Sequence, residues 1–177
     1  MLAQLHQTLH ATDRMPKILV LFADEPTAMI NAVADGARSV RFSEVELRRV
    51  DETGPATPSS HHYQTLAGAD DLMTYDGIVV ATSEDGAVHP ALGLLLEQAA
   101  ANAPAAAWQS KVGSALMTEP SEQRLNVWPA LTTLGDLGML MLAPSGGDAE
   151  AARALGARVA QVVGWVTHAR SHHHHAH

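Results

Sequence analysis

Consecutive apolar residues alternate along this chain with segments whose apolar residues recur at helical spacing. Four apolar runs cover residues 17–23, 76–82, 111–117 and 138–143, while apolar and polar side chains alternate over residues 45–50. Continuous apolar runs are typical of strands that are buried on both faces of a parallel sheet, and alternation is typical of a half-buried edge strand. The pattern therefore predicts five strands.

Helical periodicity follows four of these strands. It predicts helices over residues 27–40, 90–99, 121–135 and 148–168. Residues 51–67 are polar and predict a loop, and the alanine-rich residues 103–107 predict a linker. Strands that alternate with helices predict a parallel sheet with helices on both faces.

The length of 177 residues is enough for one domain with a substantial core, which we assign to residues 15–169. Residues 1–14 form an N-terminal extension in which Leu2, Leu5 and Leu9 fall at helical spacing. This extension is either a short amphipathic helix that packs on the body or on a partner, or a tail without a function. The histidine-rich residues 170–177 resemble an expression tag.

Composition excludes several classes of protein. Without cysteine, the chain has neither disulfides nor thiolate chemistry. A formal net charge of -8 disfavours nucleic acid as a partner, because binding to phosphates needs clustered lysine and arginine. No apolar run approaches the roughly 20 residues of a membrane span, and the N-terminus lacks the pattern of a secretion signal. A cytoplasmic protein without a membrane partner is expected.

Local sequence similarity narrows the fold further. Segments across most of the core resemble flavodoxin-like NAD(P)H:quinone oxidoreductases of the WrbA type: residues 17–22, 32–37, 49–53, 75–80, 95–98 and 132–139. The resemblance implies a flavodoxin-like three-layer α/β sandwich with a five-stranded parallel sheet in the order 2-1-3-4-5. It also implies flavin mononucleotide (FMN) as cofactor, NAD(P)H as the reductant of bound FMN, and a homo-oligomer, either a dimer or a tetramer.

In that family, FMN is bound by three loops at the carboxyl ends of strands one, three and four. The residues that the resemblance assigns to cofactor binding, if FMN binds, are Thr27 in the first loop, Thr82, Ser83 and Gly86 in the second, and Thr118 and Ser121 in the third. Trp108 falls near the position at which the family has a tryptophan beside the flavin.

All three loops depart from the family pattern in the same direction. The first has Asp24, Glu25 and Pro26 where a glycine-containing turn is expected. The second loop carries Glu84 and Asp85, and the third carries Glu119 and Glu122 without any glycine. Two like charges 4 Å apart cost on the order of 4 kcal/mol before screening, so a phosphate dianion would be repelled. These loops predict that FMN binding is lost or weakened.

The loop acids have a second interpretation, because clustered oxygens bind hard cations such as Mg²⁺. Solvated loop carboxylates explain them better, and we predict no metal site and no catalytic side chain. His89 before Pro90 is a candidate to cap a helix or to act as an acid or base, although a lone loop histidine more often does neither. Trp128 and Trp165, which lie among apolar residues at helical spacing, are expected to be core or interface anchors.

Two functions therefore stay open. In the first, the protein is a binding or regulatory protein on a flavodoxin-like scaffold whose FMN site is lost or weakened. In the second, it is an active FMN-dependent NAD(P)H:quinone oxidoreductase, as the resemblance implies. The loss of glycine from the loops favours the first, and the intact scaffold segments leave the second open.

Overall fold

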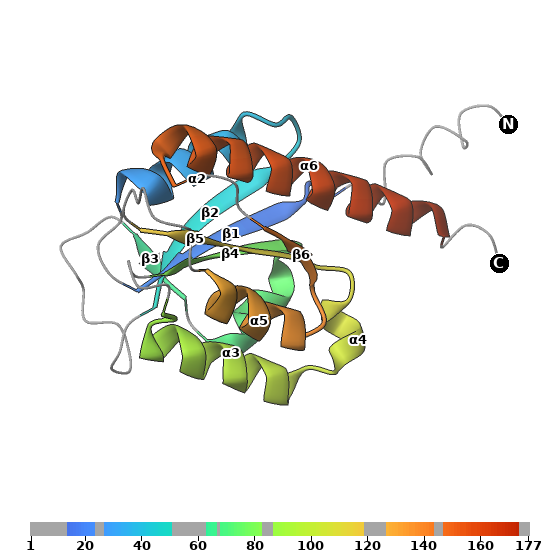
Figure 1. Ribbon diagram of the computed structural model, residues 1–177. Coiled ribbons are helices and arrows are strands. Elements are labelled where there is room, and N and C mark those ends of the chain that lie inside the picture. Colours follow the sequence, from blue (N-terminus) through green and yellow to red (C-terminus); the bar gives the residue numbers. More distant parts are fainter. Residues whose placement is uncertain are drawn as a thin grey trace, which may run out of the picture.

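A parallel sheet lies between two layers of helices (Figure 1). The computed structural model describes residues 14–23, 27–50, 63–66, 68–82, 87–118, 127–143 and 147–173. Its strands are β1 (Lys17–Phe22), β2 (Glu44–Arg49), β3 (Gln64–Thr65), β4 (Gly77–Thr82), β5 (Val112–Met117) and β6 (Leu140–Leu142). The helices are α2 (Ala28–Arg38), η1 (Ala69–Thr74), α3 (Pro90–Asn102), α4 (Ala105–Trp108), α5 (Trp128–Asp136) and α6 (Ala149–His173).

The strands follow the order β3-β2-β1-β4-β5-β6, and every neighbouring pair is parallel. The five longer strands thus have the predicted order 2-1-3-4-5, which is confirmed. Strand β3 was not expected, because its residues fall inside the predicted polar loop 51–67. It has only two residues, too few for any periodicity, and it pairs with Arg48 and Arg49 at the end of β2.

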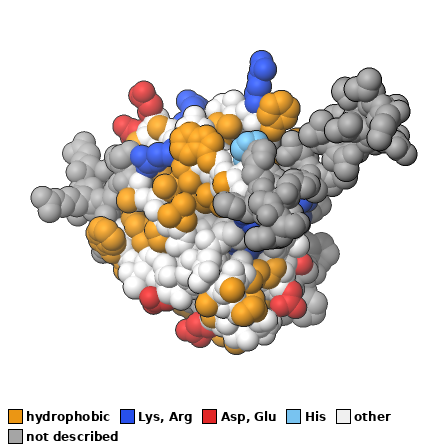
Figure 2. Space-filling model, turned by 90° about the vertical axis from the view of Figure 1, so that its right-hand side faces the viewer, with side chains coloured by type: hydrophobic (Ala, Val, Ile, Leu, Met, Phe, Trp, Pro, Cys, Tyr) orange, Lys and Arg blue, Asp and Glu red, His pale blue; other side chains and the backbone are white. Residues whose placement is uncertain are grey.

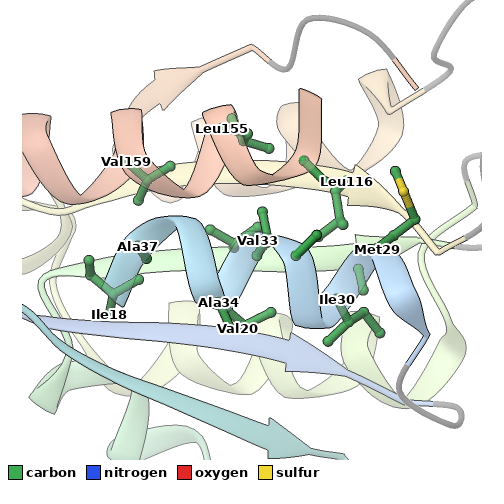
Figure 3. Close-up of a cluster of buried hydrophobic side chains, with 14 of the residues drawn as sticks. Ile18, Val20, Met29, Ile30, Val33, Ala34, Ala37, Leu116, Leu155 and Val159 are labelled. Atoms are coloured by element: carbon green, nitrogen blue, oxygen red, sulfur yellow. The ribbon is translucent and has the colours of Figure 1, made fainter. Parts of the chain in front are cut away.

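Helices α2 and α6 cover one face of the sheet, and η1, α3, α4 and α5 cover the other. Successive residues of a strand point to opposite faces. Accordingly, Ile18 and Val20 of β1 pack under α2 and α6, whereas Leu19 and Leu21 pack under α3 and η1. Figure 3 shows the first of these clusters, in which Ile18 and Val20 of β1 lie beside Ala37 and Ala34 of α2, with Leu155 and Val159 of α6 on the other side of that helix in this view.

Two glycines allow α2 and α6 to pack with their backbones in contact. A Cβ atom on Gly36 of α2 would lie 1.9 Å from the carbonyl oxygen of Arg153 in α6. Reciprocally, a Cβ atom on Gly156 of α6 would lie 1.9 Å from the carbonyl oxygen of Val33 in α2. Only hydrogen fits at either position, so the two helices can cross at this distance only with glycine on both sides.

The residues that precede β1 are fastened to the amino-terminal edge of the sheet by Asp76. The buried carboxylate of Asp76 accepts a hydrogen bond from Arg14 Nη2 at 2.7 Å through Oδ1. Its other oxygen, Oδ2, accepts one from the backbone N–H of Lys17 at 2.9 Å. A charged group loses hydration when it is buried, and these two bonds replace it. The chain therefore enters the domain at a fixed point.

Three predicted boundaries need correction. The expected linker 103–107 instead contains helix α4, because alanine is the best helix former and the buried Trp108 anchors the turn. Helix α5 begins at Trp128, with Pro129 in its first turn; most of the predicted earlier part lies outside the described residues. Strand β6 begins at Leu140 rather than at Gly138, whose φ of 96° is incompatible with a strand.

Trp128 and Trp165 are exposed by 68% and 69%, so neither belongs to the core. Helical spacing identifies which side chains share a helix face, but not whether another element covers that face. The expectation of a core role was wrong for both residues. An interface role stays a prediction.

Replacing Gly36 by alanine should force α2 and α6 apart. We expect Gly36→Ala to lower the free energy of unfolding by about 3 kcal/mol, because the added methyl group would overlap a backbone carbonyl that cannot rotate away. Urea denaturation followed by circular dichroism measures this. Gly93→Ala is the control, since a Cβ atom at Gly93 in α3 meets nothing within 4 Å. The free energy of unfolding of that variant should rise by about 0.5–1 kcal/mol. Equal stability of the two variants would contradict the close crossing.

Candidate functional site

The carboxyl ends of the parallel strands meet at one edge of the sheet, opposite the edge at which the chain enters. Register pairing aligns Phe22 of β1 with Arg49 of β2, and Thr82 of β4 with Met117 of β5. The backbone N–H of Val50 donates to the carbonyl of Phe22 at 2.9 Å. In open α/β sheets this edge is where ligands bind. It is the candidate site.

Thr27 stands at the start of α2 on this edge. Its backbone is extended, and its Oγ1 accepts a long hydrogen bond of 3.5 Å from the backbone N–H of Ile30. A hydroxyl that accepts still has its own hydrogen to donate. The first-turn amides of a helix have no intrahelical acceptor and carry a partial positive charge, so this end of α2 is suited to an anion.

Unlike Thr27, which caps a helix, Thr82 and Thr118 form hydrogen bonds between β4 and the end of β5. Thr82 is buried, and its hydroxyl donates to the carbonyl of Leu116 in β5 at 3.2 Å. The carbonyl of Thr82 accepts from the backbone N–H of Thr118 at 2.9 Å. The two residues extend the pairing of β4 with β5 by one step. The only hydrogen of the Thr82 hydroxyl is thus engaged within the sheet, whereas the half-buried Thr118 side chain lies at its end.

The other predicted cofactor-binding residues, Ser83, Gly86 and Ser121, lie outside the described residues. The same is true of the loop acids Asp24, Glu25, Glu84, Asp85, Glu119 and Glu122. Among the residues that the structure does describe, no three histidine, aspartate or glutamate side chains are grouped to hold a metal ion.

Helix α3 also begins at this edge, and its first turn confirms one of the two predicted roles of His89. The Nδ1 atom of His89 accepts a hydrogen bond of 3.3 Å from the backbone N–H of Ala91. Pro90 occupies the first turn, where a missing N–H costs nothing. His89 is therefore the N-cap of α3.

Two residues at this edge were not anticipated as site residues. Arg49, the last residue of β2, places a basic group beside the end of β1. Trp128 presents an exposed indole next to Val127, which is buried against Met117 of β5 and Val88 just before α3. Trp128 therefore begins α5 near the carboxyl end of β5. Only the tertiary packing of Val127 reveals this position, since the sequence pattern is that of any amphipathic helix.

Trp108 lies at the opposite edge of the sheet, which overturns its expected place beside the cofactor. It belongs to α4, directly before β5, and is almost fully buried. The Lys111 ammonium lies 6.0 Å from the centre of its ring and donates to the carbonyls of Met73 and Tyr75. Burial lowers the pKa of Lys111, and the nearby carboxylate of Asp76 partly offsets this. Trp108 and Lys111 hold the end of η1 against the sheet.

A polar cluster on β2 is also distinct from the candidate site. Glu46 Oε2 accepts from Tyr75 Oη at 2.8 Å and from Arg48 Nε at 2.8 Å. Burial of Tyr75 and its hydrogen bond to Glu46 raise the pKa of Tyr75 to about 12. Burial also acts to raise the pKa of Glu46, but the bonds from Tyr75 and Arg48 hold it below its ordinary value. The cluster ties β2 to the segment before β4.

Solved structures with the same architecture are flavoproteins. The chain superposes on a diflavin flavoprotein A3 from Nostoc sp. with a TM-score of 0.55 and 15% identity, over 91% of this chain and 99% of that one. It superposes on Megasphaera elsdenii flavodoxin with a TM-score of 0.57 and 14% identity, over 82% and 98%. At such identities the likeness concerns the fold alone, which is flavodoxin-like.

Curated relatives with similar sequences indicate the family, whereas the solved structures show the fold alone. The NAD(P)H dehydrogenase (quinone) of Nitrobacter winogradskyi is 33% identical over 141 residues, covering 72% of this chain and 70% of the relative. The protein of the same name from Rhodopseudomonas palustris strain TIE-1 is 31% identical over the same shares. A shorter match, 43% identical over 77 residues, is to the NAD(P)H dehydrogenase (quinone) of Acidithiobacillus ferrooxidans and covers 38% of each chain. The chain belongs to the NAD(P)H dehydrogenase (quinone) family.

No family model matches the chain. In the described part of the chain, no helix combines the length and the apolar character that crossing a membrane requires.

The polar cluster on β2 predicts a loss of stability in alkaline solution. Folding raises the pKa of Tyr75, so Tyr75 contributes to the free energy of unfolding. This contribution is complete below about pH 10, where tyrosine is neutral in both the folded and the unfolded chain, and it is lost as the pH rises towards 12. Across this interval we expect the free energy of unfolding to fall by about 2–3 kcal/mol, as measured by urea denaturation at each pH. The Tyr75→Phe substitution should abolish this fall. Tyr63→Phe is the matched control and should keep the loss. The assignment fails if Tyr75→Phe and the unsubstituted protein lose stability equally.

Proposed function

We propose that this protein is a flavodoxin-like NAD(P)H:quinone oxidoreductase with a weakened FMN site. The observation that carries the proposal is the amino end of α2, which Thr27 caps at the carboxyl edge of β1. Family membership supports it, because relatives that share about a third of their residues with this chain bear the name NAD(P)H dehydrogenase (quinone). The flavoprotein fold supports FMN rather than another cofactor.

Thr27 and the first-turn amides of α2 would hold the FMN phosphate, and Thr118 would lie beside the flavin. When bound, FMN supplies the hydride and electron transfer that no side chain provides. Trp128, exposed at the start of α5, is suited to stack on a flat ring. The role of this chain is thus to hold and orient the cofactor and to limit water around it.

The affinity is weakened for two reasons. The loops contain acids and prolines where the family has glycine and hydroxyl groups, and each carboxylate near the phosphate opposes its charge. The second reason is Thr82, whose hydroxyl must leave the carbonyl of Leu116 before it can donate to a ligand. We therefore expect FMN to dissociate during purification and to bind again when it is added.

A second candidate function is a flavin-free binding or regulatory protein. It is favoured by the acidic, glycine-poor character that all three loops share. This protein would keep the scaffold and would use the carboxyl edge, or the exposed tryptophans, for a partner.

Titration with FMN distinguishes the two functions. The oxidoreductase predicts saturable quenching of flavin fluorescence in the micromolar range, followed by quinone reduction when NADH or NADPH is added. A protein that ignores a large excess of FMN, while circular dichroism shows it folded, is the flavin-free one. Activity only after preincubation with FMN would identify the weakened site.

Paired threonine substitutions test which hydroxyl contacts the phosphate. Thr27→Val should raise the dissociation constant of FMN about tenfold or more, because a hydrogen bond to a charged group is lost. Thr27→Ser should restore the original dissociation constant of FMN. Thr82→Val should change it less than about twofold, since that hydroxyl already donates within the sheet. A larger effect at Thr82 than at Thr27 would reverse the assignment.

A homo-oligomer, either a dimer or a tetramer, is part of the same proposal. The exposed side chains of Leu94, Trp128 and Leu140 supply apolar surface for contacts between copies. Light scattering after size-exclusion chromatography should give a multiple of the chain's mass, and a monomer at every concentration would refute this part.

A further inference from the structure

A groove of about 550 Å³ opens on the side of the molecule opposite the candidate cofactor site. It is lined by residues 14–16 before β1, residues 40–43 between α2 and β2, and residues of α6 between 160 and 168. Figure 2 views the molecule from this side and shows hydrophobic side chains gathered there. The groove belongs to the amino-terminal edge of the sheet, so the chemistry of the carboxyl edge does not explain it.

Three large apolar side chains in the groove face solvent. Met15 is 51% exposed, Phe42 is 76% exposed and Trp165 is 69% exposed. Each comes from a different segment of the chain, so no single amphipathic element accounts for them. Exposed apolar side chains that gather in a hollow mark a surface for another apolar element.

The backbone at Phe42 indicates that this exposure is built in. Phe42 has a φ of 66°, a left-handed conformation that is costly for a bulky side chain. The turn is held by Ser43, whose hydroxyl bonds the carbonyls of Ala37 at 2.9 Å and Val40 at 3.0 Å. Glycine or asparagine would fill such a turn without strain. A strained residue that points an aromatic ring into solvent is expected where the ring has a contact to make.

The chain itself provides an occupant. Arg14 and Pro16 line the groove, and Asp76 fastens Arg14 and the N–H of Lys17 to the sheet. Residues 1–13 therefore start from a fixed point at the rim. A segment tethered so closely has a high effective concentration at the groove, which no separate partner matches at equal intrinsic affinity.

The sequence of residues 1–13 complements the groove. Leu2, Leu5 and Leu9 share one face of a helix. Thirteen helical residues extend about 20 Å, and residues 160–168 of α6 rise only about 12 Å, so the segment is long enough to span them. It contains Asp13 and no lysine or arginine, so none of its side chains adds a fixed positive charge beside Arg14 and Arg41 on the rim.

We propose that residues 1–13 bind along this groove as a helix and cover Phe42 and Trp165 with the face formed by Leu2, Leu5 and Leu9. A helix this short is marginal in water, so the groove supplies the packing that makes it form. The extension then completes the amino-terminal edge of the domain.

Engineered disulfides test this directly, because the chain has no cysteine of its own. His6 flanks the leucine face, and His6→Cys leaves all three leucines in place. In the groove pair, it is combined with Gln161→Cys, on the groove side of α6. In the control, the Gln98 pair, it is combined with Gln98→Cys, which is exposed on α3 across the sheet. In a glutathione buffer, the groove pair should form the intramolecular disulfide with an equilibrium constant about tenfold or more above that of the Gln98 pair.

Two further variants separate docking from random encounter. Leu5→Asp on the leucine face should lower the disulfide yield of the groove pair to that of the Gln98 pair. Gln7→Asp, on the opposite face of the same helix, should leave the yield unchanged. Equal yields from both cysteine pairs would overturn the proposal. So would a groove-pair disulfide that links two chains, which would show that a second copy occupies the groove.

Discussion

The backbone contact between α2 and α6 constrains the layer of helices above β1. Because Gly36 and Gly156 carry no Cβ atom, the two helices pack closely over the centre of the sheet, and the apolar residues of both reach the same strands. A wider separation would leave Ile18, Val20 and Val159 with incomplete packing. Because the chain leaves β1 at its carboxyl end, the amino end of α2, with Thr27, lies at that edge of the sheet, where an anion can meet the first-turn amides.

The two edges of the sheet have different roles, since all its strands run in one direction. At the amino-terminal edge, Asp76 and Lys111 are buried and bonded to backbone groups, so they fasten the strands and the entering chain. At the carboxyl edge, the described residues include Thr27 at the start of α2, Thr82 at the end of β4 and Thr118 directly after β5. Groups whose hydrogen bonds are satisfied internally stabilise a fold, whereas the first-turn amides of a helix such as α2 have no intrahelical acceptor and suit an anion. This asymmetry favours the carboxyl edge for the cofactor and leaves the groove at the other edge for a structural contact.

Much of the fold was predictable because its elements are long and strongly periodic. The strands that became β1, β4 and β5 lie within about a residue of their predicted bounds, since each is an uninterrupted apolar run between polar turns. The site was less predictable. Thr27, Thr82 and Thr118 do come to the same edge, but the sequence contains no sign that the hydroxyl of Thr82 bonds across to Leu116. Trp108 was misplaced because its distance along the chain from the third loop did not reveal which edge of the sheet it reaches.

By itself, the sequence determined that strands and helices alternate, because such apolar runs and helical faces are buried together in a parallel sheet covered by helices. The resemblance of local segments then indicated the flavodoxin-like arrangement and the family. It also determined the acidic, glycine-poor character of the loops. The tertiary structure alone decided which groups are free to act. It engaged the Thr82 hydroxyl inside the sheet, exposed Trp128 beside the carboxyl edge, and placed Phe42 and Trp165 in one groove. The physical reason is that burial and hydrogen bonding depend on neighbours far away in the chain, which local pattern does not specify.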